Sequence, residues 1–139
     1  MSPWVKDPDS GGVKIPQQVR ERVKQRILKY AETNYSGQYI RLDIRFRGQF
    51  CYIDAYKEPN LAPDFPPPDF PESREEYLER IRNNPIHLCR LRYFGDSEGW
   101  GFAFYTYSQE KYELSVLNSG DFYGTPEEAF ESSAMYLQD

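Results

Sequence analysis

The segment from residue 39 to residue 57 restricts the fold of this chain more than any other. In its first half, apolar and polar side chains alternate with the period of two that is typical of a half-buried strand. Gly48 and Gln49 then suit a two-residue turn with glycine at its first central position. This turn predicts a hairpin in which Ile44 lies opposite Ile53 and every inward pair is apolar. The predicted outward pairs are Arg41/Tyr56, Asp43/Asp54 and Arg45/Tyr52.

The rest of the chain predicts three helices and three more strands around this hairpin. A first helix begins at Pro16, a second follows a capping box that starts at Ser73, and a third begins after Thr125. Residues 86–117 alternate in the manner of a three-stranded meander. The resulting order, α-β-β-α-β-β-β-α, predicts an α+β fold, an antiparallel five-stranded sheet with helices packed mainly on one face.

Length and composition indicate one domain. With 139 residues, 12 Tyr and 9 Phe, the chain has the size and the apolar content for one hydrophobic core. We expect a flexible arm over residues 1–14 and a single α+β domain over residues 15–139, with a stiff connection at residues 58–71, six of which are proline. No apolar run is long enough to cross a membrane and residues 1–10 do not resemble a signal peptide, so we expect a cytoplasmic protein without membrane contact.

The two halves of the sequence carry opposite net charges. Residues 1–57 have a net charge of +5 and residues 58–139 a net charge of −10, which together give −5 for the chain. Such an asymmetry indicates either a half that binds nucleic acid or two halves that neutralise each other, within one fold or across a dimer. The acidic total favours the second interpretation.

The second face of the predicted sheet is the main candidate for function, because it combines arginines with aromatic rings. A pairing of Phe94 with Trp100 puts the aromatic side chains of the following strand on this face, away from the helices. Since monomers rarely leave such a patch in water, we expect Phe65 and Phe70 of the proline-rich connection, or a second subunit, to cover it. Arg47 also lies on this predicted face. The candidate binding residues are Arg41, Arg45, Tyr52, Tyr56, Arg90, Arg92, Trp100, Phe102 and Phe104.

Two binding functions suit this face. The leading hypothesis is a small non-enzymatic protein-binding or assembly domain that needs no cofactor, forming a homodimer or binding another protein. The alternative is a single-stranded nucleic-acid binder, because arginines between aromatic rings hold such strands. Residues 98–105 resemble the RNA-recognition octapeptide, but Glu98 stands where that motif has a basic residue.

The third hypothesis is a metal-dependent hydrolase at Asp43 and Asp54. Like charges directly opposite each other on a sheet are destabilising, so a divalent metal ion or a shared proton would explain the pair. Some nucleases add a lysine to such a pair, but Lys57 is three residues from Asp54 and points to the other face. Arg41 and Arg45, which flank Asp43, can compensate the negative charges of the pair without any catalysis. We favour this explanation over an enzymatic one.

His87 is the only histidine, which excludes a zinc site made of several histidines. In the predicted register it faces the helices together with Cys89. A thiol–histidine nucleophile is one interpretation of this pair, and ordinary packing is the commoner one. Cys51 and Cys89 are too few for a disulfide framework.

Four blocks of the chain resemble a known group of sequences. The segments RFRGQFCYIDAY, LCRLRYFGD, GWGFAFYTYS and GDFYGTPEEAF look like those of conserved hypothetical bacterial proteins, chiefly from cyanobacteria. The resemblance covers most of residues 13–137 and implies no activity.

Overall fold

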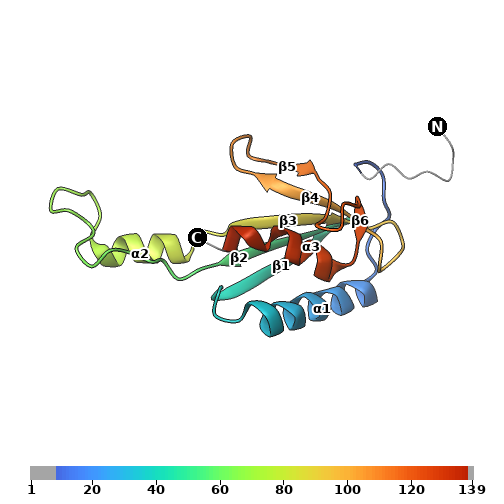
Figure 1. Cartoon of the computed structure of the whole chain (residues 1–139), viewed down its shortest axis with the longest axis horizontal. Coiled ribbons are helices and arrows are strands. Elements are labelled where there is room, and N and C mark those ends of the chain that lie inside the picture. The colour runs from blue at the N-terminus through green and yellow to red at the C-terminus, as the bar shows by residue number, and fades with distance from the viewer. Residues whose placement is uncertain (1–8, 138–139) are drawn as a thin grey trace.

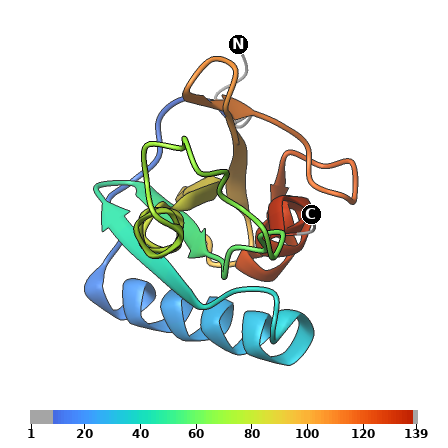
Figure 2. The same cartoon turned by 90° about the vertical axis from the view of Figure 1, so that its left-hand side faces the viewer.

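The computed structural model describes residues 9–137, which form a two-layer α+β fold (Figure 1). The first and last α-helices lie against one face of a single antiparallel sheet, as the sequence predicts (Figure 2), whereas the middle one projects beyond the end of the sheet. In chain order, the elements are α1 (Gln17–Tyr35), β1 (Arg41–Arg47), β2 (Phe50–Tyr56), α2 (Arg74–Arg82), β3 (Ile86–Arg92), β4 (Trp100–Thr106), β5 (Lys111–Leu114), β6 (Tyr123–Gly124), α3 (Pro126–Ser133) and the 3₁₀-helix η1 (Ala134–Leu137).

The sheet is a meander, in which strands that follow each other in the sequence also pair in space. Its order is β1-β2-β3-β4-β5, and the short strand β6, which the sequence does not predict, pairs with the start of β4. The β1–β2 hairpin has the predicted register, with Ile44 opposite Ile53 and Asp43 opposite Asp54. Gly48 has a φ of 59°, a value that other residues rarely adopt, so glycine is what permits the tight turn.

The hydrophobic core lies between the sheet and the helices α1, α3 and η1 (Figure 2). α1 buries Val23, Ile27 and Ala31, which form one stripe at helical spacing. α3 adds the fully buried ring of Phe130. The opposite side of the sheet is left without a helix in the described part of the chain.

Both capping boxes predicted from the sequence are present. Ser73 accepts a hydrogen bond from the backbone N–H of Glu76 before α2, and Thr125 accepts one from that of Glu128 before α3. In each case the glutamate side chain returns a bond to the backbone of the capping residue, so two helix-end donors are satisfied together. α1 begins one residue later than predicted, because Pro16 occupies the position before the first helical residue.

The register of β3 against β4 differs from the prediction by one residue. Leu91, rather than Arg92, lies opposite Phe102. Because side chains alternate between the two faces of a strand, this shift moves every side chain of β4 to the other face. The expected place of the β4 aromatic residues beside the arginines is therefore wrong: Trp100 and Phe102 are buried in the core and Phe104 packs against it. Rings of this size bury about 150–250 Å² each, which favours the observed register.

Residues 58–85, which we call the acidic arm, project from one end of the sheet between β2 and β3 (Figure 1). The arm contains the proline-rich connection and α2, and no residue of α2 is buried. The expectation that Phe65 and Phe70 cover the sheet is wrong. Their ring centroids lie 5.2 Å apart, and both rings also pack on Tyr77 of α2. The arm therefore has a small aromatic cluster of its own.

The segment before α1 runs along the end of the sheet. The backbone N–H of Val13 donates to the carbonyl oxygen of Tyr93, and that of Ile15 donates to the carbonyl oxygen of Gly48, both at 2.9 Å. This part of the expected flexible arm is thus attached to the domain. The remainder of that prediction, residues 1–8, lies outside the described residues.

Candidate functional site

The sheet face opposite the helices is the candidate site. Pairing of the strands brings arginines from β1 and β3 together with tyrosines from β2, β4 and β5. We call this surface the tyrosine–arginine face. Its residues are Arg41, Asp43, Arg45, Arg47, Phe50, Tyr52, Asp54, Tyr56, His87, Arg90, Arg92, Tyr105 and Tyr112.

Asp54 is the most buried charged residue that the structure describes, with 3% of its surface exposed. Its Oδ2 atom accepts a hydrogen bond from the guanidinium of Arg45 at 2.7 Å, and its Oδ1 atom lies 2.9 Å from Nδ1 of His87. Asp43 lies beside the same guanidinium, 3.4 Å from Nε of Arg45. One arginine therefore compensates both aspartates of the predicted pair.

The group expected for a metal-dependent hydrolase is not assembled. Arg45 lies where a cation shared by Asp43 and Asp54 would sit. Lys57 donates a hydrogen bond to the backbone oxygen of Leu137, away from the two carboxylates. Within residues 9–137, no three His, Cys, Asp or Glu side chains come together in a way that could hold a metal ion.

His87 reaches Asp54 because β2 and β3 pair irregularly. Ile53 pairs with Cys89, whereas the next residue of β2, Asp54, pairs with His87, which leaves Leu88 as the extra residue of a β-bulge. The bulge turns His87 to the tyrosine–arginine face, while Leu88 and Cys89 both lie in the core. The prediction that His87 and Cys89 share the helix side of the sheet is therefore wrong.

The two cysteines are buried and do not provide a nucleophile. Burial raises the pKa of Cys89 to about 12 and raises the pKa of Cys51 well above its ordinary value. Thiolates are therefore suppressed near neutral pH. Because Cys89 and His87 lie on opposite faces of the sheet, no thiol–histidine pair is formed.

Tyrosine rings surround the exposed side of the Asp54–His87 pair. The ring centroid of Tyr112 lies 5.5 Å from that of Tyr52 and 5.1 Å from that of Tyr105, and Tyr105 lies 4.5 Å from the imidazole. These rings border a cavity of about 540 Å³, a volume that suits a small organic molecule. We call it the tyrosine cavity, and its lining residues are Arg45, Phe46, Arg47, Tyr52, His87, Tyr105 and Tyr112.

Three other arginines of the face stack on aromatic rings. The guanidinium of Arg41 lies 3.9 Å from the ring centre of Tyr56, and those of Arg90 and Arg92 lie 4.4 and 4.7 Å from the ring centre of Phe50. The Nε atoms of Arg90 and Arg92 are buried without a hydrogen-bond partner. Burial, and then the neighbouring charge of Arg92, lower the pKa of Arg90. This part of the face therefore holds closely spaced positive charges.

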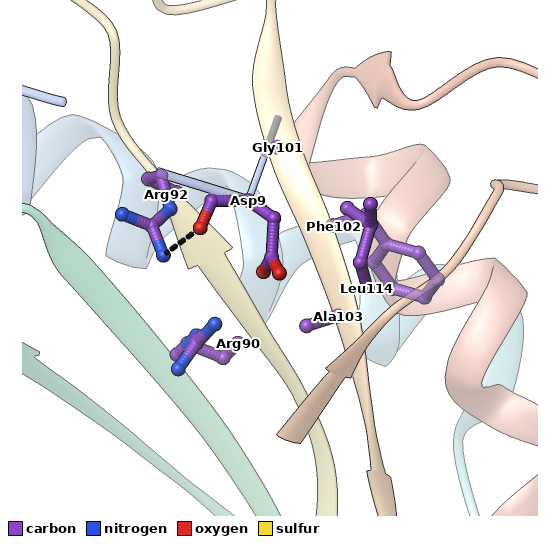
Figure 3. Close-up of a pocket in the computed structure, with 7 residues that line it drawn as sticks. All are labelled: Asp9, Arg90, Arg92, Gly101, Phe102, Ala103 and Leu114. Atoms are coloured by element: carbon purple, nitrogen blue, oxygen red, sulfur yellow. Dashed lines mark hydrogen bonds between the residues drawn. The ribbon is translucent and has the colours of Figure 1, made fainter. Parts of the chain in front are cut away.

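The N-terminal segment occupies one corner of the face (Figure 3). Arg92 donates hydrogen bonds to the backbone oxygens of Gly11 and Asp9, at 2.8 and 3.2 Å. Asp9 lies over a shallow pocket that Arg90 and Leu114 also line. The chain itself thus fills this corner, and the tyrosine cavity is the larger hollow of the face.

The structure brings together most of the binding residues predicted from the sequence, and it adds three others. The predicted binding residues on the face are Arg41, Arg45, Tyr52, Tyr56, Arg90 and Arg92, and the misplaced ones are Trp100, Phe102 and Phe104. The additional residues are His87, Tyr105 and Tyr112. The correct β4 register would have revealed the two tyrosines, but no sequence signal marks the bulge that redirects His87.

No protein-family model, curated protein or solved structure matches the chain. Between residues 9 and 137, none of the helices has the length and apolar character needed to span a membrane. The geometry of the tyrosine–arginine face is therefore the basis for a functional proposal.

Proposed function

We propose that this chain is an assembly domain whose tyrosine–arginine face binds the acidic arm of a second copy. The observation that carries the proposal is the complementary charge of the two surfaces. The arm has seven acidic residues and three arginines, whereas the face has five arginines and two aspartates. Complementary charges at two surfaces steer them together and fix their orientation.

The position of the arm favours contact with another molecule. The arm leaves the sheet after β2, returns at β3, and extends away from the core (Figure 1). Arg74 donates a hydrogen bond to the backbone oxygen of Phe65 at 2.6 Å, which fixes the proline-rich segment to the start of α2. Asp64, Asp69 and Glu75 are exposed and form no ion pair with a described residue. These carboxylates are available to a basic surface.

The tyrosine–arginine face has the composition of a protein interface. Arg41 and Arg47 are exposed and form no ion pair with a described carboxylate. Tyr52, Tyr105 and Tyr112 are only partly buried, and tyrosine and arginine are enriched among the residues that contribute most to protein binding. An acidic partner would neutralise the arginines and cover the rings together. Since each copy has both surfaces, a reciprocal exchange closes as a two-fold dimer.

An arm-deleted variant provides a direct test. Ala55 of β2 pairs with Ile86 of β3, so the two strands already adjoin where the arm leaves the sheet. A short Asn-Gly turn in place of residues 58–84 therefore preserves the sheet and removes the proposed ligand. Arg41→Glu reverses a charge on the proposed receptor surface. Arg22→Glu, on the exposed side of α1, is the matched control for the charge change.

Light scattering at low ionic strength measures the result. The wild type and Arg22→Glu should have twice the 16.4 kDa mass of one chain, while the arm-deleted and Arg41→Glu variants should have the mass of one chain. Added salt should dissociate the wild-type dimer, because interactions between exposed charges are largely screened beyond about 10 Å at 0.1 M salt. A monomeric wild type, or an arm-deleted variant that stays dimeric, would overturn the proposal.

Single-stranded nucleic acid is the second candidate ligand of this face. The observation in its favour is the stacking of Arg90 and Arg92 on Phe50, beside tyrosine rings that bases can stack on. Fluorescence anisotropy with a labelled oligothymidine tests it. Binding that weakens steeply with salt in the wild type and is lost in Arg90→Met would support this ligand, since phosphate contacts release counterions. Unchanged anisotropy would contradict it.

A further inference from the structure

Self-assembly does not explain one feature of the tyrosine cavity, an imidazole nitrogen without a protein partner. Nδ1 of His87 lies 2.9 Å from the Asp54 carboxylate, which can only accept hydrogen bonds, so Nδ1 carries a proton. In the neutral ring, Nε2 then has a free lone pair. Nε2 forms no hydrogen bond with any residue from 9 to 137. The side chain is 30% exposed and lines the cavity, so a ligand there has access to this nitrogen.

His87 is held in place from two sides. Asp54 binds the ring, and Arg45 in turn binds Asp54 at 2.7 Å. The hydroxyl of Tyr107 accepts a hydrogen bond from the backbone N–H of His87 at 2.8 Å, and it lies 3.4 Å from the carbonyl oxygen of the same residue. A carboxylate that fixes the tautomer and orientation of an imidazole is the arrangement that makes histidine an effective general base.

We propose that His87 is a general base that removes a proton from a small aromatic compound bound in the tyrosine cavity. The cavity volume of about 540 Å³ matches a small molecule, and the rings of Tyr52, Tyr105 and Tyr112 offer it stacking and edge contacts. Arg47 lines the same cavity and adds a positive charge for an anionic product. This proposal does not depend on assembly through the acidic arm. An arm that covers the same three rings would compete with the ligand, so the tests below are made at a salt concentration that dissociates the dimer.

The proton transfer is balanced within the site. A weakly acidic C–H or O–H bond of the ligand breaks, its electron pair stays on the ligand, and the proton forms a bond with Nε2 of His87. The imidazolium that results is stabilised by the Asp54 carboxylate. The hydroxyl of Tyr112 remains a donor for the new anion, because burial and then the nearby charge of Asp54 raise the pKa of this tyrosine.

Nitrogen-15 NMR can observe the proton on this ring directly, because the chain has one histidine. In protein labelled at histidine, we expect the neutral ring to be protonated at Nδ1 and unprotonated at Nε2. Asp54→Asn should move the proton to Nε2, since the amide can donate to Nδ1. Asp43→Asn is the matched control and should leave the tautomer unchanged, because Asp43 contacts Arg45 and not the imidazole. A neutral wild-type ring protonated at Nε2 would overturn the proposal.

The proton-accepting activity can be tested with 5-nitrobenzisoxazole, a small aromatic probe. A base removes its C–H proton, the electron pair forms the nitrile, the N–O bond breaks, and a coloured nitrophenolate is released. We expect the wild type and Glu32→Gln, an exposed change on α1 outside the face, to accelerate this reaction beyond an equal concentration of free imidazole. His87→Gln should lower the rate about 100-fold, a typical contribution of a positioned base. Equal rates for the wild type and His87→Gln, with circular dichroism confirming the fold of both, would overturn the assignment of His87 as the base.

Discussion

The carboxylate of Asp54 and the imidazole of His87 lie 2.9 Å apart across β2 and β3, on the sheet face that the helices leave open. The bulge at Leu88 creates this contact, because regular pairing would turn His87 toward the core. Arg45 binds the second oxygen of the same carboxylate. Asp54 therefore links β1, β2 and β3 and also borders the tyrosine cavity, so a change at this residue affects stability and the site together.

Asp54→Ala should lower the free energy of unfolding by about 2 kcal/mol, because Arg45 and His87 each lose a charged acceptor. The value is below the usual loss for a fully buried ion pair, since half of the Arg45 side chain is exposed and water replaces part of the bond. Asp43→Ala is the control and should cost less than about 1 kcal/mol, since Asp43 is 44% exposed. Urea unfolding of the three proteins measures both values. Equal losses in the two variants would contradict the central role of Asp54.

Thr125→Ala should lower the free energy of unfolding by about 1 kcal/mol, the ordinary loss for an N-cap side chain. The Thr125 hydroxyl accepts the backbone N–H of Glu128 at 3.1 Å, and alanine leaves this donor without a protein partner. Thr125→Ser keeps the acceptor and should retain most of the stability. Thermal unfolding compares the two variants, and an unchanged melting temperature in Thr125→Ala would show that the cap contributes nothing to α3.

The thiols of Cys51 and Cys89 should not react with Ellman's reagent in the native protein at pH 8, and both should react in urea. Burial raises the pKa of Cys89 to about 12, above the ordinary thiol value of about 8.5. Because the folded state holds this proton more tightly, the stabilising contribution is complete below about pH 8.5 and is lost as the pH rises toward 12. As the pH rises, the urea concentration at the midpoint of unfolding should fall less steeply for Cys89→Ala than for the wild type. Rapid labelling of the native protein at pH 8 would contradict the buried position of both residues.

The β1–β2 hairpin could be predicted from the sequence because local chemistry and burial point to the same register. Gly48 supplies the positive φ of the turn, and that turn leaves Ile44 and Ile53 on the buried side. The capping boxes at Ser73 and Thr125 could be predicted equally well, since each depends on residues three positions apart in the sequence. These elements required no knowledge of distant contacts.

The register of β4 and the orientation of His87 could not be predicted in the same way. The loop between β3 and β4 permits more than one pairing, and the burial of Trp100 against Tyr93 and β6 selects the observed one. The bulge at Leu88 depends on the fit of β3 to its neighbours rather than on a local turn. The register of β4 and the bulge in β3 thus both depend on tertiary packing. Together they determine which aromatic rings reach the site, so the rings predicted from the sequence differ from those observed.

A pair of substitutions in β4 tests that register most directly. Phe102 is 1% exposed and contacts the core, so Phe102→Ala should lower the free energy of unfolding by about 3–5 kcal/mol through the cavity it leaves. Tyr105 lies on the other face and is partly exposed, so Tyr105→Ala should cost less than about 2 kcal/mol and should act mainly on the tyrosine cavity. The register predicted from the sequence gives the reverse order, because it places Phe102 on the open face and Tyr105 under the helices. Urea unfolding of both variants decides between the two registers, and a smaller loss for Phe102→Ala than for Tyr105→Ala would overturn the observed one.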